Sequence, residues 1–337
     1  KNTSVHAQRQ QKFSHIYNID NEIIKFNSKI SFSAKVYNQL YNTENKLIDT
    51  NNYHTGSIYR LFPIIGMNVE TPFKIKNSKF NLIFKPTTQL VISPGSSNSN
   101  KVSNEDSSNN SYTLDNISSL NRFSGNDKMD NSKRLNFGFV LKNNQFKLGL
   151  SQIYEFTENS NFHNEQGNDD HLSDLLGALE LEGENSFSYN FRYDHKDSFI
   201  KEQNMHSQFK NDLGNISISY LDQKSKVDEI IVQDTETFNY NFETKKFLRF
   251  SKINISGLYD LKKEINTEYT LGYRYFDECF GINIDFSRKS YKEETLKPQD
   301  ILTLMFSFKN IGSYKSSNLA VSETDKEDIE WVGDMID

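Results

Sequence analysis

Large apolar side chains recur at every second residue along most of the chain, with small or polar residues between them. Successive side chains of a pleated strand point to opposite faces, so this spacing predicts strands with one apolar and one polar face. The alternating sets are Phe80, Leu82, Phe84, Thr88, Leu90 and Ile92; Leu135, Phe137, Phe139 and Leu141; Phe146, Leu148, Leu150, Gln152, Tyr154 and Phe156; Phe187, Tyr189, Phe191 and Tyr193; Phe238, Tyr240 and Phe242; Tyr269, Leu271, Tyr273 and Tyr275; Phe280, Ile282, Ile284 and Phe286; and Leu302, Leu304, Phe306 and Phe308.

The pattern predicts about fifteen strands of roughly 9 to 14 residues, long enough to cross a bilayer when tilted. Intervening residues such as Asn283 and Asp285 suit a wet lumen better than a packed core. We therefore expect an all-β fold, a large antiparallel transmembrane β-barrel. Because bacterial single-chain barrels close with an even number of strands, the odd count predicts incomplete closure. The expected strands span residues 12–20, 28–40, 57–72, 79–93, 132–142, 145–157, 172–182, 186–195, 198–210, 213–222, 235–243, 248–260, 266–276, 279–288 and 299–310.

The connectors support a membrane barrel. If the last strand ends on the periplasmic side, counting backwards places the long connectors outside and the short ones inside, which is typical of outer-membrane barrels. We assign residues 1–312 to the C-terminal part of the barrel and residues 313–337, which are acidic and lose the alternation, to a mobile periplasmic tail. The long connectors are expected at 41–56, 94–131, 158–171, 223–234 and 289–298.

Composition narrows the class further. The chain has 26 Phe and 17 Tyr against one Trp and five Pro, which favours strands. No run approaches the ~18 apolar residues of a membrane-spanning helix. A net charge of -6 argues against a nucleic-acid partner. The chain starts at Lys1 without a leader, so we expect a signal peptide to be missing or removed and the N-terminus to be a cut end.

Several short sequence blocks occur in a fixed order between Arg60 and Gly312. In this order and spacing they resemble the C-terminal barrel domain of the lipopolysaccharide-assembly proteins of the LptD family. The blocks are Arg60-Leu61-Phe62-Pro63; Phe84-Lys85-Pro86 with Gln89-Leu90; Asn104-Glu105-Asp106-Ser107; Asp115; Asn121-Arg122-Phe123-Ser124-Gly125 with Asp127; Arg134; Phe137-Gly138; Gly149; Gln152-Ile153-Tyr154; Tyr275-Phe276-Asp277-Glu278-Cys279-Phe280; and Arg288.

The resemblance implies an integral protein of the Gram-negative outer membrane that inserts lipopolysaccharide into the outer leaflet through a barrel lumen and a lateral seam. It implies an LptE-like lipoprotein plug inside the barrel. It also implies a periplasmic lipopolysaccharide bridge, reached through an N-terminal jellyroll domain that, with the first barrel strands, precedes the residues seen here. The seam is then expected along the last strand, at Leu302, Leu304, Phe306 and Phe308.

Cys279 is the only cysteine, so it forms no disulfide within this chain. From the residues alone, a bond to a segment outside this sequence and a small buried hydrophobe are equally open. Counting connectors places Cys279 at a periplasmic turn. Many relatives have two adjacent cysteines there, paired with the jellyroll domain, so the resemblance implies a disulfide from Cys279 to that missing domain.

The connector 94–131 begins Pro94-Gly95 and runs through Ser-Asn repeats, which are typical of a solvated loop. A structureless loop of this length is usually either functional or unfolded. Two interpretations therefore stay open: a loop that folds over or into the lumen against the plug, and a simply solvated one. The residues expected to take part in the first case are Asn104, Glu105, Asp106, Ser107, Asn121, Arg122, Gly125 and Asp127.

The sequence offers little for catalysis or metal binding. No nucleophile elbow, paired-cysteine set or phosphate loop occurs, so we expect no catalytic residue and no cofactor. The alternatives kept open are a passive porin-like barrel, a lipid-modifying barrel, for which the turn from His195 to Ser198 is the place to look, and a soluble β-protein. Asp194 and Asp197 at that turn are expected to be turn formers. A group that fits no metal-ligand spacing is interpreted as a charged outer loop: His163, Glu165, Asp169, Asp170 and His171.

Overall fold

The computed structural model describes residues 7–49, 52–76, 81–93, 98–107, 113–157, 171–227, 230–245, 247–277, 279–290, 298–309, 312–315 and 319–321. In this part of the chain the regular elements are all strands, and no helix is long and apolar enough to cross a membrane. The strands are β1 (Arg9–Lys25), β2 (Ser28–Asp49), β3 (Asn52–Glu70), β4 (Phe73–Lys76), β5 (Asn81–Ile92), β6 (Lys133–Lys142), β7 (Phe146–Glu155), β8 (Leu175–Leu181), β9 (Ser186–Asp194), β10 (Phe199–Lys210), β11 (Gly214–Val227), β12 (Ile230–Thr244), β13 (Ser251–Asp260), β14 (Ile265–Phe276), β15 (Phe280–Lys289), β16 (Gln299–Phe308), β17 (Gly312–Lys315) and β18 (Leu319–Val321).

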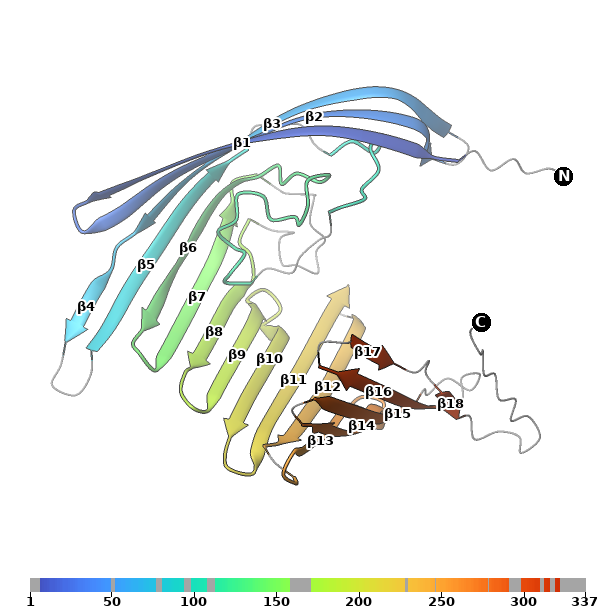
Figure 1. Ribbon diagram of the computed structural model, residues 1–337. Helices are drawn as coiled ribbons and strands as arrows, with labels where there is room; N and C mark the ends of the chain where they lie inside the picture. The colour runs from blue at the N-terminus through green and yellow to red at the C-terminus, as the bar shows by residue number, and fades with distance from the viewer. Residues whose placement is uncertain are drawn as a thin grey trace. The chain divides into compact units, whose positions relative to one another are not determined.

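The chain divides into two compact units. Unit 1 comprises residues 1–181 and 190–201, and unit 2 comprises residues 182–189 and 202–337. In unit 1, the long strands β1, β2 and β3 are antiparallel neighbours (Figure 1). β3 then pairs with β5, which also pairs with the short β4, and β5 is followed by β6, β7 and β8. Taken alone, unit 1 is an open antiparallel sheet with β1 at one edge.

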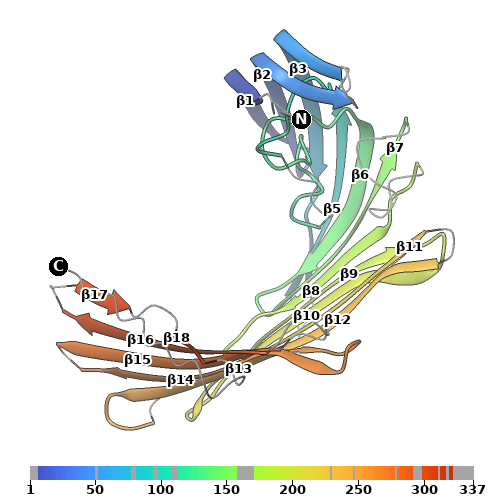
Figure 2. The same cartoon turned by 90° about the vertical axis from the view of Figure 1, so that its right-hand side faces the viewer.

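Unit 2 is an antiparallel meander in which each strand pairs with the next one along the chain, from β10 to β16. Figure 2 shows β14, β15 and β16 side by side. The other edge of β16 pairs with β17 and β18. Each described strand pairing in the two units is antiparallel, which confirms the all-β antiparallel fold expected from the alternation.

The register of unit 2 shows why the alternation was informative. Ile255 lies opposite Leu271, which lies opposite Phe286, which lies opposite Leu302. A strand turns successive side chains to opposite faces, so the alternating apolar sets of β12 to β16 share one face of the sheet. We call this the aromatic face of unit 2. The opposite, polar face carries Asn and Ser residues such as Asn283, which lies opposite Met305.

All fifteen expected strands are present, and three short ones, β4, β17 and β18, were not expected. Two connector predictions are wrong. Most of 41–56 belongs to β2 and β3, and most of 223–234 belongs to β11 and β12. The reason is that backbone pairing continues where the apolar alternation ends: Thr43 still lies opposite Gly56, and Gln223 opposite Thr235. The periodicity marked the apolar part of each strand and not its full length.

The described part of the expected tail 313–337 contains most of β17 and all of β18, both paired with β16. The rest of that range lies outside the described residues. Neither the boundary at residue 312 nor the mobile character of the tail is tested, and both remain predictions.

Candidate functional site

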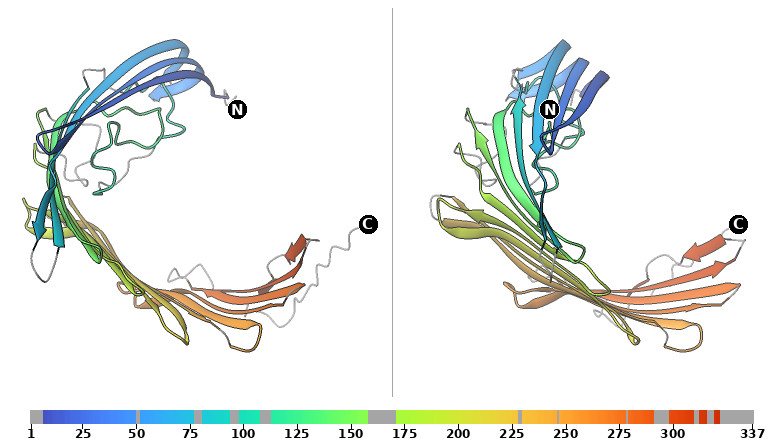
Figure 3. Two further views of the ribbon diagram at one scale, coloured as in Figure 1. Left: turned by 60° about the vertical axis from the view of Figure 1, so that its left-hand side comes forward. Right: turned by 90° about the vertical axis from the view of Figure 1, so that its left-hand side faces the viewer.

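The segment 98–132, described except for residues 108–112, connects β5 to β6 and packs on one face of unit 1 (Figure 3). We call this segment the inner loop and the face it covers the loop-side face. Two apolar clusters hold it. Ile117 and Phe123 of the loop are buried with Ile153 of β7 and Leu176 of β8. Met129 of the loop is buried among four residues of β2, β3 and β5, namely Tyr37, Phe62, Ile64 and Val91.

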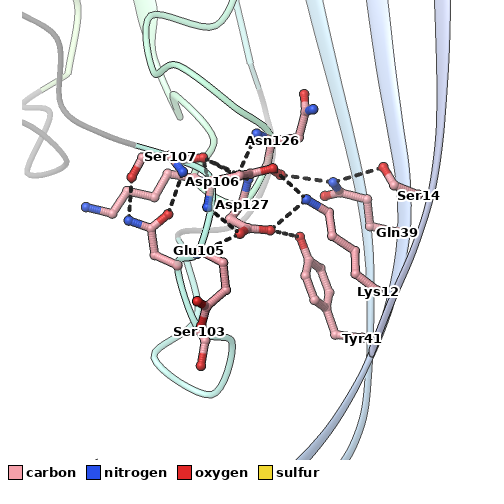
Figure 4. A network of polar contacts seen from close by, with 12 residues as sticks. Lys12, Ser14, Gln39, Tyr41, Ser103, Glu105, Asp106, Ser107, Asn126 and Asp127 are labelled. Carbon is pink, nitrogen blue, oxygen red and sulfur yellow. Dashed lines mark hydrogen bonds and ion pairs between the residues drawn. The ribbon is translucent and has the colours of Figure 1, made fainter. Parts of the chain in front are cut away.

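Asp127 is the centre of the polar contacts between the inner loop and strands β1 and β2 (Figure 4). Its carboxylate is almost fully buried and accepts hydrogen bonds from Lys12 Nζ of β1 at 2.7 Å and from the Tyr41 hydroxyl of β2 at 3.1 Å. The other carboxylate oxygen accepts the backbone N–H groups of Glu105 and Asp106, at 2.9 and 3.2 Å. One side chain therefore joins both halves of the inner loop to two strands.

Asp106 forms the complementary half of this network. Its Oδ1 accepts the backbone N–H groups of Asn126 and Asp127 at 2.9 and 2.8 Å, and its Oδ2 lies 3.0 Å from Lys12 Nζ. Partial burial by itself would raise the pKa of Asp106, but the hydrogen bonds from Asn126, Lys12, Ser107 and Asp127 outweigh it and hold that pKa well below its usual range. Lys12 is thus clamped between the carboxylates of Asp106 and Asp127.

Arg60 of β3 fixes the turn of the inner loop from the neighbouring strand. Its guanidinium donates to the backbone carbonyl of Asp127 at 2.6 Å, to that of Asn126 at 2.9 Å and to the Tyr41 hydroxyl at 2.8 Å. Gln39 of β2, which is fully buried, accepts from Arg60 and donates to the same Asn126 carbonyl at 2.9 Å. Backbone carbonyls of the loop are therefore satisfied by side chains of the sheet, as burial of polar groups requires.

A second, fully buried ionic cluster joins the inner loop to β6 and β7. Arg122 makes a two-pronged contact with Asp130 and reaches Glu155 of β7 at 2.6 Å. Arg134 of β6 binds the same Asp130 at 2.9 Å, and the side chains of all four residues are 0% or nearly 0% exposed. Two guanidinium groups balance two carboxylates, so the cluster carries no net charge. Buried charges persist in proteins when they are paired in this way.

Gly125 is the one position of the inner loop where only glycine fits. Its φ is +75°, and a Cβ atom built there would lie 2.1 Å from the carbonyl oxygen of Asp106. Both the left-handed backbone and the close approach of the two loop halves exclude a side chain.

The other residues predicted for this loop take local roles. Asn104 bonds the backbone N–H of Ser107 at 3.0 Å, and the Ser107 hydroxyl accepts the N–H groups of Asp127 and Lys128. Asn121 Oδ1 accepts the N–H of Asp130 at 3.0 Å. The side chain of Glu105 is exposed, and its contribution is the backbone N–H described above. The eight predicted residues are thus brought together in one folded segment, whereas their functional role stays a prediction.

The residues that bind the predicted ones were not singled out from the sequence, above all Asp130 in the loop itself and Lys12, Gln39, Tyr41 and Glu155 on the strands. A usable signal existed for two of them. Gln39 and Tyr41 are both buried and lie on the face of β2 opposite to exposed Leu40, so an amide and an aromatic residue alternate there at the end of the expected strand 28–40. For Lys12, Asp130 and Glu155 nothing in the local pattern distinguishes a buried ion pair from a solvated charge.

The predicted seam residues lie in unit 2, on the aromatic face of β16. Phe308 packs against Phe280 with tilted rings whose centroids are 5.2 Å apart, and Phe306 stacks on Phe280 with centroids 6.3 Å apart. Cys279 is exposed in the tight turn between β14 and β15, where its backbone N–H donates to Asp277 Oδ1 at 2.9 Å. The exposed position excludes the buried-hydrophobe interpretation. The disulfide to a missing domain stays a prediction.

Of the charged outer loop, His163, Glu165, Asp169 and Asp170 lie outside the described residues. His171 is described, and its Nδ1 lies 2.7 Å from the carbonyl oxygen of Glu155. At the turn beginning at His195, Asp194 Oδ1 accepts the backbone N–H groups of Lys196 and Asp197, and the carboxylate pairs with Lys201 at 2.7 Å. Asp194 is therefore the turn former that the sequence suggested.

The protein-family model described as "LptD: LPS transport system D" matches residues 19–265. The chain belongs to the LptD family. That range includes the inner loop and both ionic networks except Lys12. Members of this family are transport proteins, and this chain is an integral β-barrel protein of the outer membrane. None of the curated proteins searched matches the chain.

Among solved structures, the siderophore receptor PirA from Acinetobacter baumannii is 9% identical with a TM-score of 0.48, over 89% of this chain and 57% of that one. The chain thus spans little more than half the length of this receptor. A mutant porin from Rh. blastica is 10% identical with a TM-score of 0.31, over 82% of this chain and 90% of the porin. At these scores neither likeness adds to the fold seen in the strands themselves.

Proposed function

We propose that this chain forms part of the wall of a translocon that inserts lipopolysaccharide into the outer leaflet, with the inner loop as a fixed element on the lumen side of that wall. The observation that carries the proposal is the folded inner loop. It is clamped to β1, β2 and β3 through Asp127 and Arg60, and to β7 through Arg122. A loop that was only a solvated surface connector would not need two ionic networks to hold it against the sheet.

The two faces of the strands suit a glycolipid cargo. Moving acyl chains into water costs about 0.8 kcal/mol for each CH₂ group, so the acyl chains are expected to stay in the bilayer while the sugars pass a polar lumen. This division requires a seam that opens sideways. We place the seam at the last long strand, β16, with Leu302, Leu304, Phe306 and Phe308 on its lipid side. Support comes from the shared aromatic face of these residues in the register with β15.

The inner loop is also our candidate contact for a plug protein of the LptE kind, and Cys279 for a covalent link to a periplasmic domain. Because the loop's buried charges are already paired within this chain, a partner would meet the exposed residues 104–106 and not the ionic clusters. The exposed position of Cys279 supports access by another domain.

The test compares Asp127→Asn with Glu105→Gln in cells whose only copy of the full-length protein carries the change. Both substitutions remove one carboxylate from the same loop, but Asp127 holds Lys12 and Tyr41 whereas the Glu105 side chain is exposed. We expect the arrival of pulse-labelled lipopolysaccharide at the cell surface to fall in Asp127→Asn and to remain normal in Glu105→Gln. Protein levels and heat-modifiable mobility on gels report whether each barrel has assembled. Normal lipopolysaccharide export in cells lacking the protein altogether would refute the proposal and favour a passive porin.

A further inference from the structure

The short strand β4 of unit 1 has one free edge, because the neighbouring hairpin ends before β4 begins. Lys29, near the start of β2, lies opposite Glu70, the last residue of β3, and the chain turns from β1 into β2 at Phe26 and Asn27. β4 therefore has no strand of that hairpin beside it. It pairs with β5 on its other side, and no second partner occurs among the described residues. The backbone N–H and C=O groups along one edge of Phe73–Lys76 are thus open to another strand.

An edge of this kind is a template for the addition of a strand, and proteins often guard it with lysines. The side chains of β4 are all exposed and differ between its two faces. Lys74 and Lys76 lie on one face, and Phe73 and Ile75, which are 51% and 45% exposed, lie on the other. A strand added here would meet cations on one face and apolar side chains on the other.

The lysine face of β4 borders a hollow of about 430 Å³ whose charged lining residues are all lysines. They are Lys74, Lys76 and Lys142 of β6. Lys74 lies opposite Ile83, which lies opposite Lys142, so the two ammonium groups share one face of the sheet. None of the three lysines forms an ion pair with a described residue. The hollow therefore has a positive potential that no carboxylate of its described lining offsets.

The spacing of the lysines fits an extended acidic segment. Lys74 and Lys76 are two residues apart in a strand, which places them about 7 Å apart along it. Acidic residues at alternate positions of an added strand have the same spacing, and opposite charges on neighbouring strands stabilise the pairing.

Two other anionic partners fit the hollow less well. Phospholipid headgroups would lie along the apolar face, where Phe73 stacks on Phe84 with ring centroids 6.4 Å apart, and the lysines are on the opposite face. Phosphate groups are recognised best by forked arginines or by concave sets of backbone N–H groups. The charged lining described for this hollow contains no arginine.

We propose that the free edge of β4 binds, by strand addition, an extended segment of another protein with acidic residues at alternate positions and apolar residues between them. Backbone hydrogen bonds supply the affinity in this mode of binding, and the alternating side chains supply the specificity. That the partner is periplasmic rests on the proposed function and on the side assigned to the short connectors. Binding of a peptide to β4 does not rest on either.

The experiment measures the fluorescence anisotropy of a labelled peptide of alternating Val and Glu, titrated with the full chain in a non-ionic detergent. Two further peptides are compared with it: one with Gln in place of Glu, and one that keeps Glu but is N-methylated at each central residue. We expect the first peptide to bind, with an affinity that falls as salt is added. The Gln peptide should bind at least about fivefold more weakly. The N-methylated peptide should not bind, because it lacks the backbone donors.

The decisive variant combines Lys74→Gln with Lys76→Gln, for which the affinity should fall about fivefold or more. The matched control combines Lys101→Gln with Lys133→Gln, which removes the same charge from two exposed lysines. Lys133 lies opposite Ile92, at the other end of β5 from the hollow, so this control should bind the peptide as the wild type does. Heat-modifiable mobility on gels reports whether each variant has folded.

Absence of binding to the folded wild-type protein would overturn the proposal, and would indicate that the lysines only guard the edge. Equal affinities of the two double variants would overturn it as well. Equal binding of the N-methylated peptide would show a simple anion-binding surface without strand addition. Each of these results is independent of the export assay of Asp127→Asn, so a failure here is distinguishable from a failure of the proposed function.

Discussion

The polar faces of the two units differ in the kinds of side chain that they carry and in how far those side chains are buried. In unit 1 the loop-side face carries charged residues, and the inner loop covers them and pairs them in buried clusters. In unit 2 the polar face carries mainly amides and hydroxyls, such as Asn241 and Asn254, whose side chains bond each other at 2.7 Å. Its ion pairs are open to solvent, for example Arg274 with Glu243, where Arg274 is 46% exposed.

The difference shows that the same strand pattern can serve two purposes. A face in contact with water can carry neutral side chains and exposed ion pairs. Each exposed ion pair contributes about 0 to 1 kcal/mol to the free energy of unfolding. A face that holds a folded segment needs specific partners for each buried charge, and breaking one such pair costs about 3 to 5 kcal/mol. The ionic clusters of unit 1 therefore fix where the inner loop lies. The following predictions test this contrast.

The largest effect is expected at the buried cluster. Arg122→Met removes the guanidinium that pairs with Asp130 and Glu155, so two buried carboxylates lose a partner and the free energy of unfolding should fall by about 3 to 5 kcal/mol. Urea titration of the full chain folded in lipid vesicles measures the change. The control in unit 2 is Arg274→Met, for which we expect less than about 1 kcal/mol. Equal losses in the two variants would contradict the contrast between the faces.

The next effect concerns the two faces of β16. Phe306→Lys places a charge on the aromatic face, where an ammonium near the bilayer midplane costs roughly 2 to 4 kcal/mol, whereas Ser307→Lys places it on the polar face. We expect the first variant to assemble poorly into membranes and the second to assemble normally. The measurement is the yield of heat-modifiable protein in the outer membrane. Similar yields would show that the aromatic face of unit 2 does not face lipid.

A smaller effect is expected from the backbone of the inner loop. Gly125→Ala forces a side chain into a left-handed conformation and against the Asp106 carbonyl, so a loss of about 1 to 3 kcal/mol is expected. Gly183→Ala in unit 2 is the control, because the nearest atom to its Cβ would be 3.3 Å away. Protection of residues 98–107 against hydrogen exchange should drop in the first variant only. Unchanged protection in Gly125→Ala would mean that the two halves of the loop are not packed as described.

The smallest effect is a pH dependence of the clamp on Lys12. The pKa of Asp106 is lower in the folded protein than in the unfolded chain, so its stabilising contribution is present above the unfolded value near about 4 and is lost as pH falls below it. The protection factors of residues 98–107, which are their exchange rates corrected for the intrinsic pH dependence, should therefore be constant from neutral pH down to about pH 4. In stronger acid these protection factors should fall. In Asp106→Asn the acid-induced step should disappear. An opposite trend, with loosening toward neutral pH, would exclude Asp106 as the anchor.

Much of the fold could be predicted because the alternation of apolar and polar residues is visible within a few neighbouring positions of the chain. Phe280, Ile282, Ile284 and Phe286 indicate a strand and its outward face whatever the strand pairs with. The ends of β2 and β11 could not be predicted, since the period-two alternation of apolar and polar residues stops before the backbone pairing does. The length and sequence blocks of connector 94–131 left both a folded and a solvated loop open, and its Ser-Asn repeats gave no indication of which residues pack on which strand.

The sequence by itself determined the class of fold, most strand positions, the two faces of each strand and the family, because each depends on residues close together in the chain or in a fixed order. Only the tertiary structure decided that Lys12 meets Asp127, 115 residues further along the chain, and that Arg122 meets Glu155. The physical reason is that a charged or amide side chain is equally compatible with solvent and with a buried partner. Its environment depends on where a distant segment folds, and no local pattern encodes that position.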